Sequence, residues 1–167
     1  MPPSRPWPRQ PKRRFRVKAV IVGVDPGERR VGVAVADFET RFARPLEVID
    51  RKETDAVGRI IDIVREFGAR YIVVGKPTGL SGRAGPAVEV QQEFVASLAA
   101  ASPVEVREYD ERFTSVLADR GLRAAGVRAK DLRALRDAVA AQVMLQGYLD
   151  STADSAERSD PPRGELN

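Results

Sequence analysis

The chain has 167 residues, neither cysteine nor histidine, and a formal net charge of +4. This length suits a single domain, and the composition excludes disulfides, zinc–thiolate sites, thiol catalysis and the serine triad. Any catalysis must therefore use carboxylates, lysine, hydroxyl groups or a hard cation such as Mg²⁺ or Mn²⁺. No apolar run approaches the roughly 20 residues of a membrane helix, and no signal peptide is recognisable, so we expect a cytoplasmic protein.

Both ends of the chain are predicted to be disordered, which leaves residues 18–150 as the folded domain. Residues 1–17 are rich in arginine, lysine and proline and contain no acid, so they form either a basic arm that attracts phosphate or a solubilising tail. Residues 151–167 are rich in Ser, Asp, Pro and Arg and lack periodicity. They have no assignable role.

The folded part begins with three expected strands, over residues 18–25, 30–37 and 44–49. The first contains the apolar run V-I-V-G-V and ends at Asp25, just before a Pro-Gly turn. The third is expected as an edge strand, although Pro45 weakens the prediction of a strand there. An acid at the end of a central strand lies at the rim of a sheet, where α/β proteins place metal ligands or general bases. Aspartate is also a common turn residue, so both roles stay open for Asp25.

The rest of the domain alternates between helices and strands. Apolar spacing, caps and breakers predict helices over about 55–67, 88–101, 114–125 and 129–150, strands over 71–75 and 104–109, and an irregular Gly- and Pro-rich loop over 76–86. This order of elements predicts a mixed sheet with helices on its faces.

Two adjacent acids, Asp110 and Glu111, directly follow the last predicted strand. If that strand runs parallel to the first, these acids lie at the same rim as Asp25. The alternative is that they precede a helix N-terminus, where the helix dipole favours acids.

A third acidic position, Asp137, lies inside the last predicted helix. It shares a helix face with Ala141, Met144 and Tyr148, and a second apolar stripe indicates that the helix packs on two sides. A half-buried carboxylate needs a partner. Arg133, four residues earlier, offers an ordinary ion pair, and a metal ion is the other interpretation.

Two acids at strand ends and one on a helix would suit two Mg²⁺ ions in phosphodiester hydrolysis. Four segments resemble, in order and spacing, the motifs of the bacterial pre-16S ribosomal RNA nuclease family, whose members are also called Holliday-junction-resolvase-like. These segments read V-G-V-D-P-G-E-R-R-V-G-V-A-V-A-D, I-V-V-G-K-P-T-G-L-S-G-R-A-G-P, Y-D-E-R-F-T-S and D-A-V-A-A-Q-V-M-L-Q-G-Y-L-D. The resemblance covers about residues 18–150 and implies an α/β, ribonuclease H-like fold with a five-stranded mixed sheet flanked by helices.

The resemblance also implies a site. Asp25, Glu111 and Asp137 would be its catalytic, metal-binding carboxylates, with Asp110 as a further candidate ligand and Mg²⁺ or Mn²⁺ as the cofactor. Substrate contacts are expected from Lys76 and Arg83, the two charges of the loop over 76–86, and from Arg112 in the third motif. Lys76 and Pro26 depart from the usual family pattern, but neither change removes an acid.

The implied activity is that of a metal-dependent endonuclease that processes the 5′ end of precursor 16S ribosomal RNA, with this RNA and the ribosomal subunit as partners. Two alternatives stay open: a nuclease for branched DNA, and a non-catalytic nucleic-acid-binding regulatory factor, which the basic arm would suit equally. A sugar or acetate kinase relative is disfavoured because that fold needs two such domains. The number of metal ions and the oligomeric state, a homodimer included, stay open.

Overall fold

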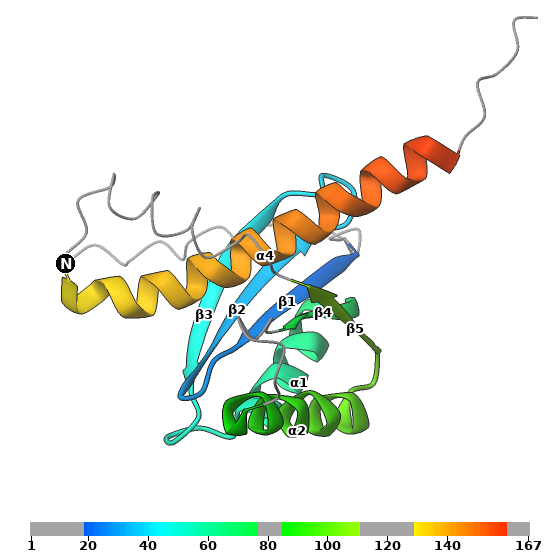
Figure 1. Ribbon diagram of the computed structural model, residues 1–167. Coiled ribbons are helices and arrows are strands. Elements are labelled where there is room, and N and C mark those ends of the chain that lie inside the picture. Colours follow the sequence, from blue (N-terminus) through cyan, green and yellow to red (C-terminus); the bar gives the residue numbers. More distant parts are fainter. Residues whose placement is uncertain (1–18, 77–84, 111–128, 160–167) are drawn as a thin grey trace, which may run out of the picture.

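The computed structural model describes residues 19–76, 85–110 and 129–159, with side chains of the last range described over 136–153. The elements within these ranges, shown in Figure 1, are β1 (Val20–Pro26), β2 (Arg30–Asp37), β3 (Ala43–Asp50), α1 (Ala56–Phe67), β4 (Ala69–Lys76), α2 (Pro86–Ala101), β5 (Glu105–Asp110) and α4 (Ala129–Ser159). None of the described helices is both long and apolar enough to cross a membrane.

The strands form one five-stranded mixed sheet in the order β3-β2-β1-β4-β5. β1 pairs antiparallel with β2, and β2 with β3, whereas β1, β4 and β5 run parallel to one another. The carboxyl ends of these three parallel strands therefore meet at one edge, which we call the acid rim. β3 lies at the edge of the sheet, a position where strands tolerate a proline such as Pro45. The predicted mixed sheet is confirmed.

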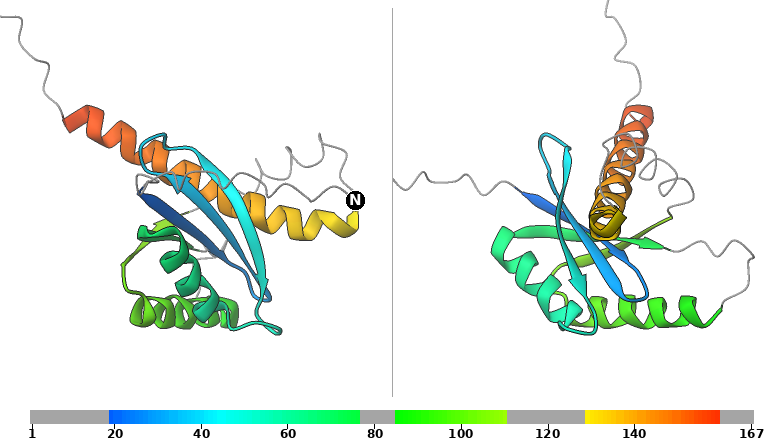
Figure 2. Two further views of the ribbon diagram at one scale, coloured as in Figure 1. Left: turned by 180° about the vertical axis from the view of Figure 1, so that it is seen from behind. Right: turned by 90° about the vertical axis from the view of Figure 1, so that its left-hand side faces the viewer.

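Helices cover both faces of the sheet, as Figures 1 and 2 show: α1 and α2 on one face, α4 across the other. We call these the α1–α2 face and the α4 face. Side chains of β1 alternate between them, because Val22 and Val24 belong to the core with α1 and α2, whereas Ile21 belongs to the core with α4. This alternation decides which functional side chains can meet.

Two glycines let α4 lie directly on the strands. A Cβ atom at Gly23 would come within 2.8 Å of the Leu145 Cβ, and one at Gly32 within 2.1 Å of the Asp137 carbonyl oxygen. Both distances are shorter than real Cβ contacts, so larger residues here would push the helix away. Close contacts at Asp137 and Leu145 thereby hold α4 against β2 and β1.

Local signals predicted the boundaries of α1. The Asp55 side chain accepts a hydrogen bond from the Gly58 amide at 3.2 Å, and Gly68 ends the helix in the left-handed conformation with φ of 60°. The expected loop over 76–86 begins and ends inside regular elements, since Lys76 belongs to β4 and Pro86 to α2. Residues 77–84 and the predicted helix over 114–125 lie outside the described residues.

The end of α4 corrects one prediction. The helix continues past Asp150 to Ser159, so the expectation of disorder from residue 151 is wrong for 151–159. Arg41, in the connection between β2 and β3, donates hydrogen bonds to the Leu149 carbonyl and, at 2.7 Å, to the Thr152 hydroxyl. These contacts tie the part of the helix around Leu149 and Thr152 to the connection between β2 and β3, and they come from a residue too distant in the sequence for any helical period to reveal.

Candidate active site

Asp25 lies at the acid rim as the second-last residue of β1, and it is half-buried. Its Cα partner in β2 is Gly32. On the other side of β1, the pairing with β4 ends one residue before Asp25, at the pair Val24 and Val74. Because side chains alternate along a strand, Asp25 shares the α4 face with Ile21 and Gly23. The predicted position at the end of a central strand is confirmed.

Asp137 lies over the same part of the sheet. Its carbonyl oxygen packs against Gly32, the residue paired with Asp25. The structure therefore brings Asp25 and Asp137 to one face and one rim, although most of the chain separates them. A position on the opposite side of the sheet, which would have excluded a shared metal site, is ruled out.

The carboxylate of Asp137 is half-buried and ion-paired. Its Oδ2 lies 3.2 Å from the Nε of Arg30, the first residue of β2, and 34% of the side chain is exposed. Burial has the largest effect on its pKa and raises it above the usual value, against the opposing charges of Arg30 and Arg136. Arg133, the partner considered from the sequence, lies where α4 side chains are not described, and the observed partner is Arg30.

Asp110 ends β5 at the acid rim, opposite Lys76 of β4. Tyr109 packs in the core under α4, whereas Val106 packs in the core with α1 and α2. Alternation therefore assigns Asp110 to the α1–α2 face, away from Asp25. The other expected site residues, Glu111, Arg83 and Arg112, lie outside the described residues.

The two carboxylates suit a hard cation, because Mg²⁺ and Mn²⁺ prefer oxygen ligands. Within the ranges 19–76, 85–110 and 136–153, no group of three or more acidic residues is close enough to hold a metal ion. The expected third ligand, Glu111, follows β5 directly and is not among these residues. Among the expected ligands, Asp25 and Asp137 are therefore the two that the structure places on the α4 face.

Two residues that sequence reasoning missed hold the turn after Asp25. Arg51 donates from Nη1 to the carbonyls of Gly27 and Glu28, at 3.0 and 3.4 Å, and the Gln91 side chain donates to the carbonyl of Pro26. Arg51 follows β3 and Gln91 lies on α2, so both act from the α1–α2 side of the sheet. No local pattern marks either residue, because each role depends on a contact between distant parts of the chain.

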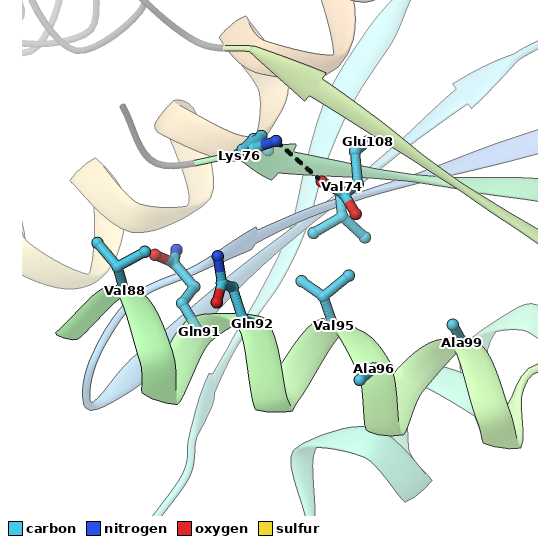
Figure 3. Close-up of a pocket in the computed structure, with 10 residues that line it drawn as sticks. Val74, Lys76, Val88, Gln91, Gln92, Val95, Ala96, Ala99 and Glu108 are labelled. Atoms are coloured by element: carbon cyan, nitrogen blue, oxygen red, sulfur yellow. Dashed lines mark ion pairs between the residues drawn. The ribbon is translucent and has the colours of Figure 1, made fainter. Parts of the chain in front are cut away.

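Lys76, an expected substrate contact, lies at the acid rim on the α1–α2 face. Its Nζ is 3.8 Å from Glu108 Oε2, at a pocket between α2 and the sheet (Figure 3). Its side chain is 60% exposed, so the ion pair leaves the ammonium group open to solvent.

Comparison with known proteins identifies the family. Residues 19–151 match the family model RuvX, described as Holliday junction resolvase. A relative from Chloroflexus aurantiacus (strain ATCC 29366 / DSM 635 / J-10-fl), named as a pre-16S rRNA nuclease, is 41% identical over 141 residues, which are 84% of this chain and 92% of the relative. A relative of the same name from Mycobacterium sp. (strain KMS) is 42% identical over 151 residues, covering 89% and 86% of the two chains.

Solved structures agree on the fold. The T. thermophilus RuvC complex with a Holliday junction substrate superposes with a TM-score of 0.52 at 20% identity, covering 80% of this chain and 96% of that one. Fowlpox virus resolvase in complex with Holliday junction DNA gives 0.51 at 12% identity, covering 80% and 98%. The expected ribonuclease H-like α/β fold is confirmed. The match to the family model over residues 19–151 and the 41% identity to the Chloroflexus relative show that the chain belongs to the RuvX family of nucleases, hydrolases that act on phosphodiester bonds.

Proposed function

We propose that this protein is a divalent-metal-dependent endonuclease that processes the 5′ end of precursor 16S ribosomal RNA in the cytoplasm. The observation that carries the proposal is that Asp25 and Asp137 lie on one face of the sheet at the acid rim, with Asp137 packed over the residue paired with Asp25. The name shared by the relatives from Chloroflexus and Mycobacterium supports the choice of RNA as substrate. A pure binding protein would gain nothing from two carboxylates on a surface that meets phosphate.

Asp25, Asp137 and Glu111 would hold one or two Mg²⁺ or Mn²⁺ ions, with Asp110 as a less favoured ligand because of its place on the opposite face. A bound cation would activate water and stabilise the leaving oxygen of the phosphodiester. The chain's own residues prepare this site: Arg30 holds the carboxylate of Asp137, and Arg51 and Gln91 hold the turn after Asp25.

Positive side chains around the acids would bind the RNA backbone. Lys76 ends β4 at the acid rim, Arg83 and Arg112 come after β4 and β5 in the sequence, and the basic residues of the arm over 1–17 would add affinity without reading bases. A precursor of the ribosomal subunit would be the partner that presents this RNA to the acid rim. Light scattering of the purified protein tests the further hypothesis of a homodimer.

The decisive experiment is a cleavage assay with the full chain and three substrates: precursor 16S RNA, an unrelated RNA of equal length and a four-way DNA junction. We expect Mg²⁺- or Mn²⁺-dependent cleavage at the 5′ end of the precursor, abolished by EDTA and by Asp25→Asn. Glu28→Gln, an exposed acid in the adjacent turn, is the matched control and should cleave normally. Absence of cleavage with every metal and substrate would contradict the proposal.

A second candidate function is the resolution of branched DNA, which the description of the family model favours. The same assay separates the two functions. Cleavage of the four-way junction in preference to precursor RNA would assign the chain to DNA, with the same acidic residues at work.

A further inference from the structure

A pocket of about 370 Å³ lies between α2 and the strands β4 and β5, on the α1–α2 face (Figure 3). Its volume falls within the range of about 300–1,000 Å³ typical of small-molecule sites. Val74 on β4 and Val95 on α2 form apolar walls, and the short side chains of Ala96 and Ala99 leave the space between α2 and the sheet open. The catalytic roles proposed above use none of these four residues.

The pocket belongs to the acid rim by position and by a direct contact. Gly75 and Lys76, at the carboxyl end of β4, line it, and β4 is the parallel neighbour of the strand that carries Asp25. Gln91 also lines it, and the same side chain donates a hydrogen bond to the carbonyl of Pro26, directly after Asp25. A group in this pocket would therefore touch the side chain that holds the turn of the proposed catalytic acid.

The lining fits a nucleobase. A base has apolar faces and hydrogen-bonding edges, and the pocket pairs valine and alanine walls with the amides of Gln91 and Gln92 and the carboxylate of Glu108. Lys76 also lines the pocket, with its ammonium group 3.8 Å from Glu108 Oε2, and this positive charge would attract the phosphate attached to such a base. These features distinguish the pocket from a simple packing gap, which would lack polar groups around its opening.

We propose that this pocket binds one unpaired nucleobase of the RNA strand, close to the phosphodiester that is cleaved at the acid rim. The strand would pass over the rim from the α4 face, with its scissile phosphate at Asp25 and Asp137 and a neighbouring base between α2 and β4. The inference rests on the proposed function for the identity of the strand, and it adds a site that selects substrates with an unpaired base at one position.

The test combines pocket-filling variants with RNA that lacks single bases. Ala99→Leu fills the pocket, and Ala100→Leu, an exposed neighbour on α2 that does not line it, is the matched control. Binding of precursor RNA is measured by fluorescence anisotropy in EDTA, with an abasic nucleotide placed at successive positions around the cleavage site. Thermal unfolding checks that all three proteins are folded.

For the wild type and Ala100→Leu, we expect one abasic position to weaken binding about tenfold, the size of one stacked base. Ala99→Leu should bind intact RNA about tenfold more weakly, and the same abasic position should cause no further loss. This lack of additivity identifies the base that enters the pocket.

The proposal is overturned if Ala99→Leu binds intact RNA as the wild type does, the result expected of a pocket that serves a protein partner. It is also overturned if the abasic and Ala99→Leu losses multiply at every position. Either result leaves metal-dependent cleavage by the wild type untouched, whereas a wild type that binds RNA but cleaves no substrate contradicts the proposed function alone.

Discussion

The two faces of the sheet carry different chemistry at the same rim. On the α4 face lie two acidic residues, Asp25 and Asp137, and the backbone of Asp137 packs against Gly32, the residue paired with Asp25. On the α1–α2 face, Lys76 and Gln91 lie at a pocket with apolar walls. Under the proposed function, one face would hold the reacting phosphate, and the other would hold the substrate strand and support the turn that presents Asp25.

The largest effect should come from Asp25→Asn on the α4 face. The amide keeps the shape of the side chain but removes the charge that a hard cation requires. We expect cleavage to fall on the order of 10³–10⁴-fold, with a melting temperature equal to or slightly above that of the wild type in metal-free buffer, because repulsion between acids is relieved. Rates are measured under single-turnover conditions. Full activity would assign Asp25 to the turn alone.

Gly32→Ala tests whether the closeness of α4 to the sheet matters. The new methyl group would meet the Asp137 carbonyl oxygen, so the helix must shift, at a cost of about 1–3 kcal/mol in the free energy of unfolding. Because the shift moves Asp137 away from Asp25, cleavage should fall more than stability alone explains. Chemical denaturation and the cleavage assay measure the two effects.

Gly85→Ala is the matched control for this change, because a Cβ atom there meets nothing within 4 Å. It should cost less than about 1 kcal/mol. Equal behaviour of the two alanine variants would show that α4 tolerates displacement and that its contact at Gly32 is unimportant for the site.

Arg51→Ala tests the support of the turn from the opposite face. It removes hydrogen bonds to two turn carbonyls and the stacking of the guanidinium on Phe94, 4.9 Å from the ring centroid. We expect a loss of about 1–2 kcal/mol in stability and a higher Mg²⁺ concentration for half-maximal cleavage, because Asp25 is held less firmly. Lys52→Ala, at the exposed neighbouring position, serves as the control. An unchanged metal requirement in Arg51→Ala would limit this residue to a structural role.

The smallest effect should come from Lys76→Ala combined with Arg83→Ala. These positive charges are expected to contact phosphate rather than to react, so the double variant should weaken RNA binding and reduce the salt dependence of the affinity by up to about two phosphate contacts. Titrations at several salt concentrations give the slope. A slope identical to that of the wild type would remove both residues from the binding surface.

Most of the fold could be predicted from the sequence because its signals are local. Apolar runs located the strands, including β3 at the edge of the sheet despite Pro45, and Asp55 and Gly68 bounded α1. The order of elements then predicted the mixed sheet. Where a tertiary contact extends an element, as Arg41 does for α4, the local signal ended too early.

The candidate site divides in the same way. The sequence by itself determined that Asp25 and Asp110 lie at the ends of strands and that Asp137 lies on a packed helix, because strand and helix periods are written in the order of residues. Only the tertiary structure decided that Asp137 lies over the partner of Asp25 and pairs with Arg30, and that Arg51 and Gln91 hold the turn. Those contacts depend on how separate elements pack in space, and no local pattern encodes that packing.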